Sequence, residues 1–251
     1  MAPLVIAILD TGINPAHRQV GSVAGGVRIA WLDGRARLTG NRLADWADEI
    51  GHGTAVAATV CDGLPPEAFA LLSVRVFGRR ADAPPHCLAA GIRWAVENRA
   101  AIVNLSAGVP VGSDPKGEAV LRAAWKEAGK ARVTLIAPRS GRGSLLIPGS
   151  LRAPVPSAVS VEADPGLEYG ALARRGRVLI APPWARPLPP LPRERNYSGV
   201  SFAVAAATNR AARLVTSEGT EPGAALAAAL LAVARADQVG AVASGTAAAD
   251  R

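Results

Sequence analysis

Cysteine is scarce in this sequence, and the cysteines present are not spaced to hold a metal. Cys61 and Cys87 each stand in an apolar segment, and neither belongs to a CxxC motif. We therefore expect two buried, reduced thiols rather than a disulfide framework. Reduced thiols are typical of proteins inside cells, so this usage favours a cytoplasmic location.

Long apolar runs are missing as well. Although 49% of the 251 residues are hydrophobic, no run approaches the roughly 20 residues that a membrane-spanning helix needs. The first ten residues have no basic start and no small-residue cleavage site, and they lead into an acidic side chain, unlike a signal peptide. We expect no membrane partner and a chain able to bury one full core.

Lysine is rare, so the net charge of +8 comes from arginine. These arginines are scattered, aromatic side chains do not alternate with them, and no nucleic-acid-binding motif occurs. The charge therefore does not indicate a nucleic-acid partner. It favours an acidic peptide or protein as the partner instead.

The sequence does contain a regular alternation of short apolar runs and helical segments. Runs rich in branched residues have the length and composition of buried parallel strands, and segments of helical period lie between them. This alternation predicts an α/β fold with a mainly parallel central sheet and helices on both faces. The expected strands are residues 4–9, 69–76, 101–105, 133–137, 158–161 and 177–181, and the expected helices are residues 52–61, 86–98, 117–131, 202–214 and 223–236.

Residues 182–195 interrupt this regularity with six prolines. A domain linker at this place would separate the candidate catalytic residues, so we expect a single domain over residues 1–237. Within it, the proline-rich segment should form an ordered or semi-rigid surface loop in extended polyproline form. Because it ends six residues before Ser201, we expect it to border the active site. Residues 238–251, rich in Ala and Gly, are expected to be a flexible tail.

Three residues suited to nucleophilic catalysis stand in distinctive surroundings. Asp10 follows the first expected strand, where α/β proteins place active-site groups, although aspartate is also common in turns. His52 lies in a Gly-His-Gly-Thr turn whose glycines let backbone and substrate approach the imidazole. Ser201 opens an Ala-rich helix, the place of an ordinary N-cap serine, but its N–H would point there toward a developing anion.

Taken together, these motifs resemble the three signatures of the subtilisin-like serine peptidases. Asp-Thr-Gly, Gly-His-Gly-Thr and Gly-x-Ser-x-Ala occur here in that family's chain order. The resemblance implies a three-layer subtilisin-like fold and a catalytic triad of Asp10, His52 and Ser201, in which the aspartate orients the histidine that takes the serine's proton. It covers most of residues 4–215, and the segments that carry it between the motifs are residues 72–78, 91–98, 102–108, 156–161 and 181–182.

The resemblance also implies a substrate-binding edge. Ser106, Ala107 and Gly108 match the family's substrate-binding strand and turn, along which an extended peptide would pair backbone to backbone. No cofactor is implied. Calcium is common in the family, but no Asp-rich loop with ligand spacing is present to place it.

One family feature is absent. The second oxyanion donor, an Asn in an Ala-Gly-Asn turn, has no counterpart in residues 137–143. Depending on the gap, its position falls on Arg139, Ser140 or Gly141, and counting back from Pro156 favours Arg139. A guanidinium could replace the amide donor, and a surface arginine is the alternative.

Two classes of function remain open at this point. One is an active serine endopeptidase of narrow specificity that processes a precursor or leader peptide alongside partner proteins of a biosynthetic pathway. The other is a degenerate peptidase fold that binds or scaffolds peptides. The segment after Ser201 departs from the family's usual sequence; it reads Phe202-Ala203-Val204-Ala205-Ala206. This departure and the missing Asn suit the second class. The presence of all three triad residues favours the first.

Overall fold

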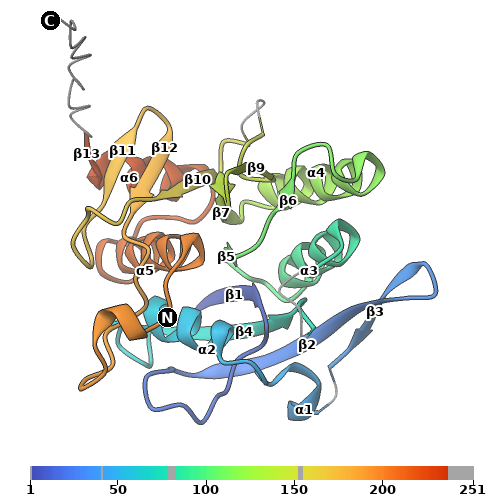
Figure 1. Ribbon diagram of the computed structural model, residues 1–251, viewed down its shortest axis with the longest axis horizontal. Helices are drawn as coiled ribbons and strands as arrows, with labels where there is room; N and C mark the ends of the chain where they lie inside the picture. The colour runs from blue at the N-terminus through green and yellow to red at the C-terminus, as the bar shows by residue number, and fades with distance from the viewer. Residues whose placement is uncertain (1, 41, 79–82, 152–154, 237–251) are drawn as a thin grey trace, which may run out of the picture.

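A ten-stranded sheet runs through the protein, with helices on both of its faces (Figure 1). The structure, a computed structural model, describes residues 2–40, 42–78, 83–151 and 155–236. The strands are β1 (Leu4–Asp10), β2 (Val23–Leu32), β3 (Arg35–Thr39), β4 (Phe69–Arg75), β5 (Ile102–Leu105), β7 (Thr134–Pro138), β10 (Ala158–Ala163), β11 (Ala173–Arg175), β12 (Val178–Ala181) and β13 (Arg235–Ala236).

The sheet is mainly parallel. Its strand order is β13-β11-β12-β10-β7-β5-β1-β4-β2-β3. Every pair from β12 to β2 along this order is parallel, and β3 and β11 pair antiparallel with β2 and β12. Three shorter strands, β6 (Val109–Pro110), β8 (Ser140–Gly141) and β9 (Ser144–Ile147), form a small separate sheet.

The helices form two layers. They are α1 (Leu43–Trp46), α2 (His52–Val60), α3 (Pro85–Glu97), α4 (Pro115–Lys130), α5 (Val200–Glu218) and α6 (Ala224–Val233), with one 3₁₀ turn, η1 (Arg193–Arg195). One apolar core joins α2, α5 and α6 to the sheet, and the other joins α3 and α4 to its opposite face.

The central strand β1 shows how the sequence produces these layers. Ile6 and Ile8 belong to the core beneath α2 and α5, whereas Ala7 and Leu9 belong to the core beneath α3 and α4. Successive strand residues point to opposite faces. A strand covered on both sides is therefore apolar throughout, as the continuous run predicted.

The six expected strands and five expected helices are all present, and the predicted α/β class is confirmed. Two helix ends differ by three residues or more. The helix predicted over 202–214 continues to Glu218. The predicted helix 223–236 ends at Val233, because the Arg235 N–H bonds to the Leu172 carbonyl and β13 pairs with β11. β2, β3 and α1 were not predicted from the sequence. Residues 238–251, the expected tail, lie outside the described residues.

Both cysteines are free and buried, as predicted. Burial raises the pKa of each thiol to about 11. Thiols with such a pKa stay protonated near neutral pH and are poor nucleophiles. Within the described ranges, no helix is both long and apolar enough to cross a membrane.

Candidate active site

The candidate site lies at the carboxyl end of two neighbouring central strands. Asp10 is the last residue of β1, and Ser106 follows the end of β5, which pairs with β1. Asn104 fixes this edge to α5, because it donates to Thr208 Oγ1 at 2.9 Å and accepts from Ser106 Oγ at 2.7 Å. The open end of a parallel sheet is where α/β proteins place their sites.

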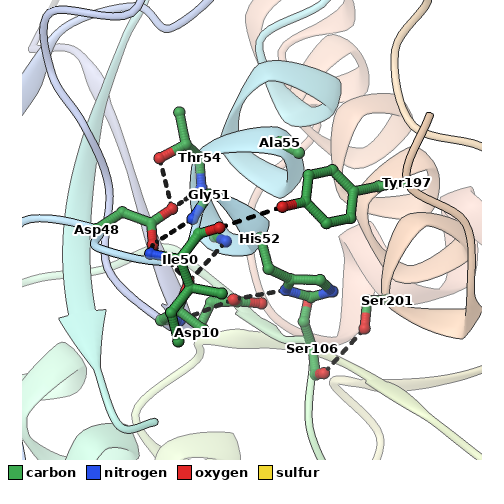
Figure 2. A network of polar contacts seen from close by, with 12 residues as sticks. Asp10, Asp48, Ile50, Gly51, His52, Thr54, Ala55, Ser106, Tyr197 and Ser201 are labelled. Carbon is green, nitrogen blue, oxygen red and sulfur yellow. Dashed lines mark hydrogen bonds and ion pairs between the residues drawn. The ribbon is translucent and has the colours of Figure 1, made fainter. Parts of the chain in front are cut away.

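Asp10 and His52 are joined by a hydrogen bond of 2.7 Å between Oδ1 and Nδ1 (Figure 2). The Asp10 side chain is fully buried and that of His52 is 27% exposed. Asp10 Oδ1 also accepts from the Thr11 N–H at 2.7 Å. A buried carboxylate on Nδ1 places the imidazole proton there and leaves Nε2 as the basic nitrogen.

Two glycines flank His52 for different reasons. Gly51 has φ of 95°, a left-handed conformation that favours glycine. At Gly53, a Cβ would collide with the carbonyl oxygen of Gly12. The turn can therefore bring His52 against β1 only with glycine on both sides of it.

The His52 imidazole has a raised pKa. Burial works to lower it, but the hydrogen bond to Asp10 and the negative charges of Asp10 and Asp48 outweigh burial. The pair therefore stabilises the protonated imidazole, which is the form that a general base reaches when it takes a proton from a nucleophile.

Asp48 is a site residue that the sequence reasoning missed. Its carboxylate accepts from the N–H groups of Ile50 and Gly51, each at 2.9 Å, and of Thr54 at 2.8 Å. It also accepts from Thr54 Oγ1 at 2.6 Å and Thr11 Oγ1 at 2.9 Å. Figure 2 shows how the backbone of the His52 turn donates hydrogen bonds to the Asp48 carboxylate.

The electrostatics of Asp48 agree with this anchoring position. Burial alone would raise the pKa of Asp48, but the hydrogen bonds from Thr54, Gly51 and Ile50 outweigh it and hold that pKa below its ordinary value. The sequence signal that could have found it is an acidic residue a few positions before a Gly-His-Gly-Thr turn. The Thr11 hydroxyl completes the link, because it accepts from the Gly53 N–H at 2.9 Å.

Ser201 lies in the first turn of α5, as predicted. In the view of Figure 2, the His52 ring lies between Asp10 and Ser201. The hydroxyl of Ser201 donates to the carbonyl oxygen of Ser106 at 3.2 Å. The structure thus brings Asp10 and His52 into direct contact and places Ser201 at the Ser106 edge.

Two aromatic rings enclose the imidazole. Phe202 and Tyr197 have ring centroids 5.4 Å and 6.0 Å from that of His52, the latter in an edge-on arrangement. The Tyr197 hydroxyl donates to the Ile50 carbonyl at 3.1 Å. These contacts restrict the orientation of the ring and exclude water from two of its sides.

The predicted oxyanion position falls on a β hairpin. Arg142 and Gly143, with φ of 49° and 79°, form the turn between β8 and β9, as two-residue hairpins require. Gly141 lies beside Val200, the neighbour of the nucleophile, since a Cβ there would be 3.6 Å from Val200 Cγ1. Arg139 points to Glu162, to which its guanidinium donates at 2.6 Å.

Of the predicted substrate edge, Ser106 and Ala107 are buried and Gly108 packs against Leu146 of β9. The strand that continues this edge, β6, pairs with β9. Across the described residues, no cluster of three or more His, Cys, Asp or Glu side chains could hold a metal ion. The roles predicted for the triad, edge and oxyanion residues stay predictions on this geometry.

The proline-rich loop is held on α2 at the end away from His52. The Arg186 N–H donates to Thr59 Oγ1 at 3.0 Å, and its guanidinium pairs with Asp62 at 3.0 Å. A bridge between Trp184 and Ser198 closes the loop just before Ser201. The loop thus connects the far end of α2 with the segment that carries Tyr197.

A mainly parallel α/β sheet with Asp, His and Ser side chains near the carboxyl ends of its central strands is the arrangement that a serine hydrolase requires. The Subtilase family model matches residues 2–163. The chain belongs to the Subtilase family. The matched range contains Asp10 and His52, and Ser201 lies beyond it.

Curated relatives match over part of the chain. Minor extracellular protease Epr of Bacillus subtilis is 31% identical over 55% of this chain and 20% of its own length. Subtilisin DY of Bacillus licheniformis is 29% identical over 49% of this chain and 43% of its own. The chain therefore matches less than half the length of these relatives.

Solved structures share the fold over most of the chain. Sphericase matches with a TM-score of 0.69 at 20% identity, covering 92% of this chain and 83% of its own. The prenylagaramide maturation protease PagA matches with a TM-score of 0.61 at 22% identity, covering 89% of this chain and 80% of its own. The protease domain of PatA matches with a TM-score of 0.58 at 21% identity, covering 88% of this chain and 83% of its own. Identities this low show a common fold.

Proposed function

We propose that this chain is a serine endopeptidase that cleaves peptide bonds through an acyl-enzyme on Ser201. The observation that carries the proposal is the 2.7 Å hydrogen bond between the buried Asp10 carboxylate and His52, with Ser201 opening α5 beside them. An aspartate–histidine pair next to a serine at a helix start is the arrangement that activates a hydroxyl.

In the proposed reaction, His52 Nε2 takes the Ser201 proton as Oγ bonds to the scissile carbonyl carbon. The carbonyl π electrons move to the oxygen, which becomes an oxyanion. When the tetrahedral intermediate collapses, the C–N bond breaks and His52 gives its proton to the leaving amine. Water, deprotonated by His52, then attacks the acyl-enzyme, and the proton returns to Ser201 Oγ as the carboxylic acid leaves.

Electrostatic stabilisation in this scheme comes from three groups. Asp10 stabilises the protonated imidazole, and the Ser201 N–H at the start of α5 faces the developing oxyanion. Arg139 or Ser140 supplies the second oxyanion donor. Arg139 would have to leave Glu162 to do so, which apo geometry permits because catalytic contacts often tighten only with substrate bound.

We further propose a narrow task, the processing of a precursor or leader peptide. Two observations support it: the usual oxyanion Asn is replaced, and the chain shares its fold with the prenylagaramide maturation protease PagA. A weakened oxyanion site leaves more of the rate acceleration to binding of remote substrate parts. We propose a cytoplasmic location, no cofactor requirement and partner proteins of the same pathway.

A peptide-binding protein without catalysis is the second candidate. It is favoured by the Ser201 hydroxyl, whose hydrogen bond goes to the Ser106 carbonyl. Such a protein would keep the edge at Ser106, Ala107 and Gly108 but not the nucleophile's reactivity.

A fluorophosphonate probe separates the two candidates, because it reacts with an activated serine only. We expect labelling of Ser201, loss of labelling in Ser201→Ala, and strong reduction in His52→Ala. Ser198→Ala, close in sequence but at the loop bridge, is the matched control and should label normally. A folded wild-type protein that stays unlabelled would contradict the peptidase and favour the peptide-binding protein.

A further inference from the structure

Two of the three arginines of the proline-rich loop are already engaged. Arg186 pairs with Asp62 at 3.0 Å and donates to the Gln19 carbonyl. The guanidinium of Arg193 lies 4.7 Å from the centroid of the Trp184 ring. Two of the loop's three arginines thus serve the loop's own packing.

A groove beside the anchored end of the proline-rich loop is also lined by arginines, and their charges are less completely neutralised. It has a volume of about 880 Å³ and lies between the end of α2, one side of α5, residues 167–173 and the end of α6. Ligand sites commonly occupy about 300–1,000 Å³. Thr59, which lines the groove, is seven residues from His52 along α2, or about 10 Å at 1.5 Å of rise per residue.

The carboxylate that lines the groove is neutralised within the fold. Asp62 is its acidic lining residue, and its two oxygens bond to Arg186 and to the Tyr169 hydroxyl, each at 3.0 Å. Burial and the Asp62 carboxylate both raise the pKa of Tyr169. The phenol therefore stays neutral and adds no negative charge to the groove.

The three arginines that line the groove are poorly neutralised. Arg213 bonds to neutral acceptors, Asn209 Oδ1 at 3.0 Å and the Asp62 carbonyl at 2.7 Å. Arg210 reaches Glu218 only at 3.9 Å. Arg235 is exposed and makes no ion pair within the described part of the chain. The groove thus has an excess of positive charge that its own residues do not cancel.

Apolar side chains share this lining, including Leu167, Leu172 and Val233. Guanidinium groups bind carboxylates through charge-assisted and often paired hydrogen bonds. A surface with both guanidinium groups and apolar side chains suits a peptide that carries acidic and apolar residues. The phosphates of a nucleic acid would contact the guanidinium groups and leave the apolar side chains unused.

We propose that this groove binds an acidic, partly apolar segment of the peptide substrate, remote from the scissile bond. This proposal rests on the proposed function, because only a peptidase would have a peptide substrate to occupy the groove. It gives the narrow specificity a physical basis, because binding energy gained here can be used to position the scissile bond at Ser201.

The test uses Ser201→Ala protein, so that nothing is cleaved and binding is measured without activity. The probe is a fluorescein-labelled peptide of four glutamates and two leucines, followed by fluorescence anisotropy, with a glutamine-for-glutamate peptide beside it. The groove variant combines Arg210→Glu and Arg235→Glu, both partly or fully exposed. Its matched control combines Arg193→Glu and Arg195→Glu in the loop.

We expect the groove variant to weaken binding of the acidic peptide at least tenfold and the loop variant to change it less than twofold. Binding should also weaken between about 50 and 300 mM salt, as expected for screened charges. Equal losses in both variants, a loss in the loop variant alone, or equally tight binding of the glutamine peptide would overturn the proposal. Tighter binding of a single-stranded oligonucleotide would do the same. Absence of fluorophosphonate labelling would refute the peptidase but leave this binding result unaffected.

Discussion

At the scale of single residues, Asp48 anchors the turn that carries His52. It accepts five hydrogen bonds, three of them from the backbone of residues 50–54. Since Thr11 follows Asp10 directly and bonds to both Asp48 and Gly53, the network ties the His52 turn to the strand that carries its carboxylate partner. Asp48 is therefore a positioning residue.

We predict that Asp48→Asn lowers kcat roughly tenfold, the equivalent of about 1.4 kcal/mol, with little change in KM. The amide cannot accept from all five donors and carries no charge. The titratable groups that face His52 are Asp10, Asp48 and the Tyr197 phenol. Because the Asp48 charge raises the His52 pKa, its loss should move the acidic limb of the kcat/KM profile to lower pH.

The control for Asp48→Asn is Glu49→Gln, which removes the same charge one residue away. Glu49 pairs with Arg75 at 3.0 Å and does not contribute to the His52 pKa shift. An unshifted acidic limb in Asp48→Asn, or an equal shift in Glu49→Gln, would contradict the positioning role. Thr54→Val, which removes one donor to Asp48, should give a smaller effect that Thr54→Ser restores.

Arg139 gives a second prediction at this scale. If its guanidinium completes the oxyanion hole, Arg139→Ala should lower kcat about 100-fold and leave KM almost unchanged, the pattern of an interaction made only in the transition state. Arg142→Ala, at the tip of the same hairpin, is the control and should retain wild-type kcat. Wild-type kcat in Arg139→Ala would instead assign Arg139 to its ion pair with Glu162 and leave the second donor to Ser140.

At the scale of elements, the proline-rich loop and α2 behave as one unit. Arg186 bonds to Thr59 and Asp62, and Asn209 and Arg213 of α5 bond to the carbonyl groups at the end of α2. The loop and both helices are thus fastened at one point, away from the chemistry.

We predict that Arg186→Ala destabilises the protein, because it breaks a partly buried ion pair and leaves Asp62 without its cation. A loss of about 1–2 kcal/mol corresponds to a fall in Tm of roughly 2–8 °C for a chain of this size. Arg195→Ala, in the exposed η1 turn, should change Tm by less than about 1 °C. Calorimetry measures both, and similar Tm values for the two variants would show that the anchor contributes little.

At the scale of the whole molecule, net charge and the candidate site together support the proposed narrow specificity. The net charge of +8 and the groove beyond α2 favour acidic peptides. With the usual oxyanion Asn replaced, substrates that lack remote contacts gain little of the rate acceleration.

We therefore predict slow hydrolysis of casein and of short chromogenic peptides, with kcat/KM below about 10⁴ M⁻¹s⁻¹, the low end for enzymes. Ser201→Ala, measured in parallel, gives the background rate. Fluorophosphonate labelling of the same wild-type sample shows that the nucleophile is competent. Rapid and indiscriminate digestion of casein would contradict a narrow specificity.

The sequence by itself determined the α/β class, the positions of the central strands and the candidate triad. It could do so because strands buried on both faces must be apolar throughout, and because a turn such as that at His52 admits only glycine beside the imidazole. These are local requirements, which a linear sequence records directly.

Only the tertiary structure decided the rest. Asp48 is far from Thr11 in the chain, β13 exists because Arg235 pairs beside Leu172, and the groove arises where α2, α5 and α6 meet. Whether an arginine pairs with a carboxylate, as Arg186 does with Asp62, or bonds to neutral acceptors, as Arg213 does, depends on which groups folding brings within hydrogen-bond reach. No local pattern in the sequence records that distance.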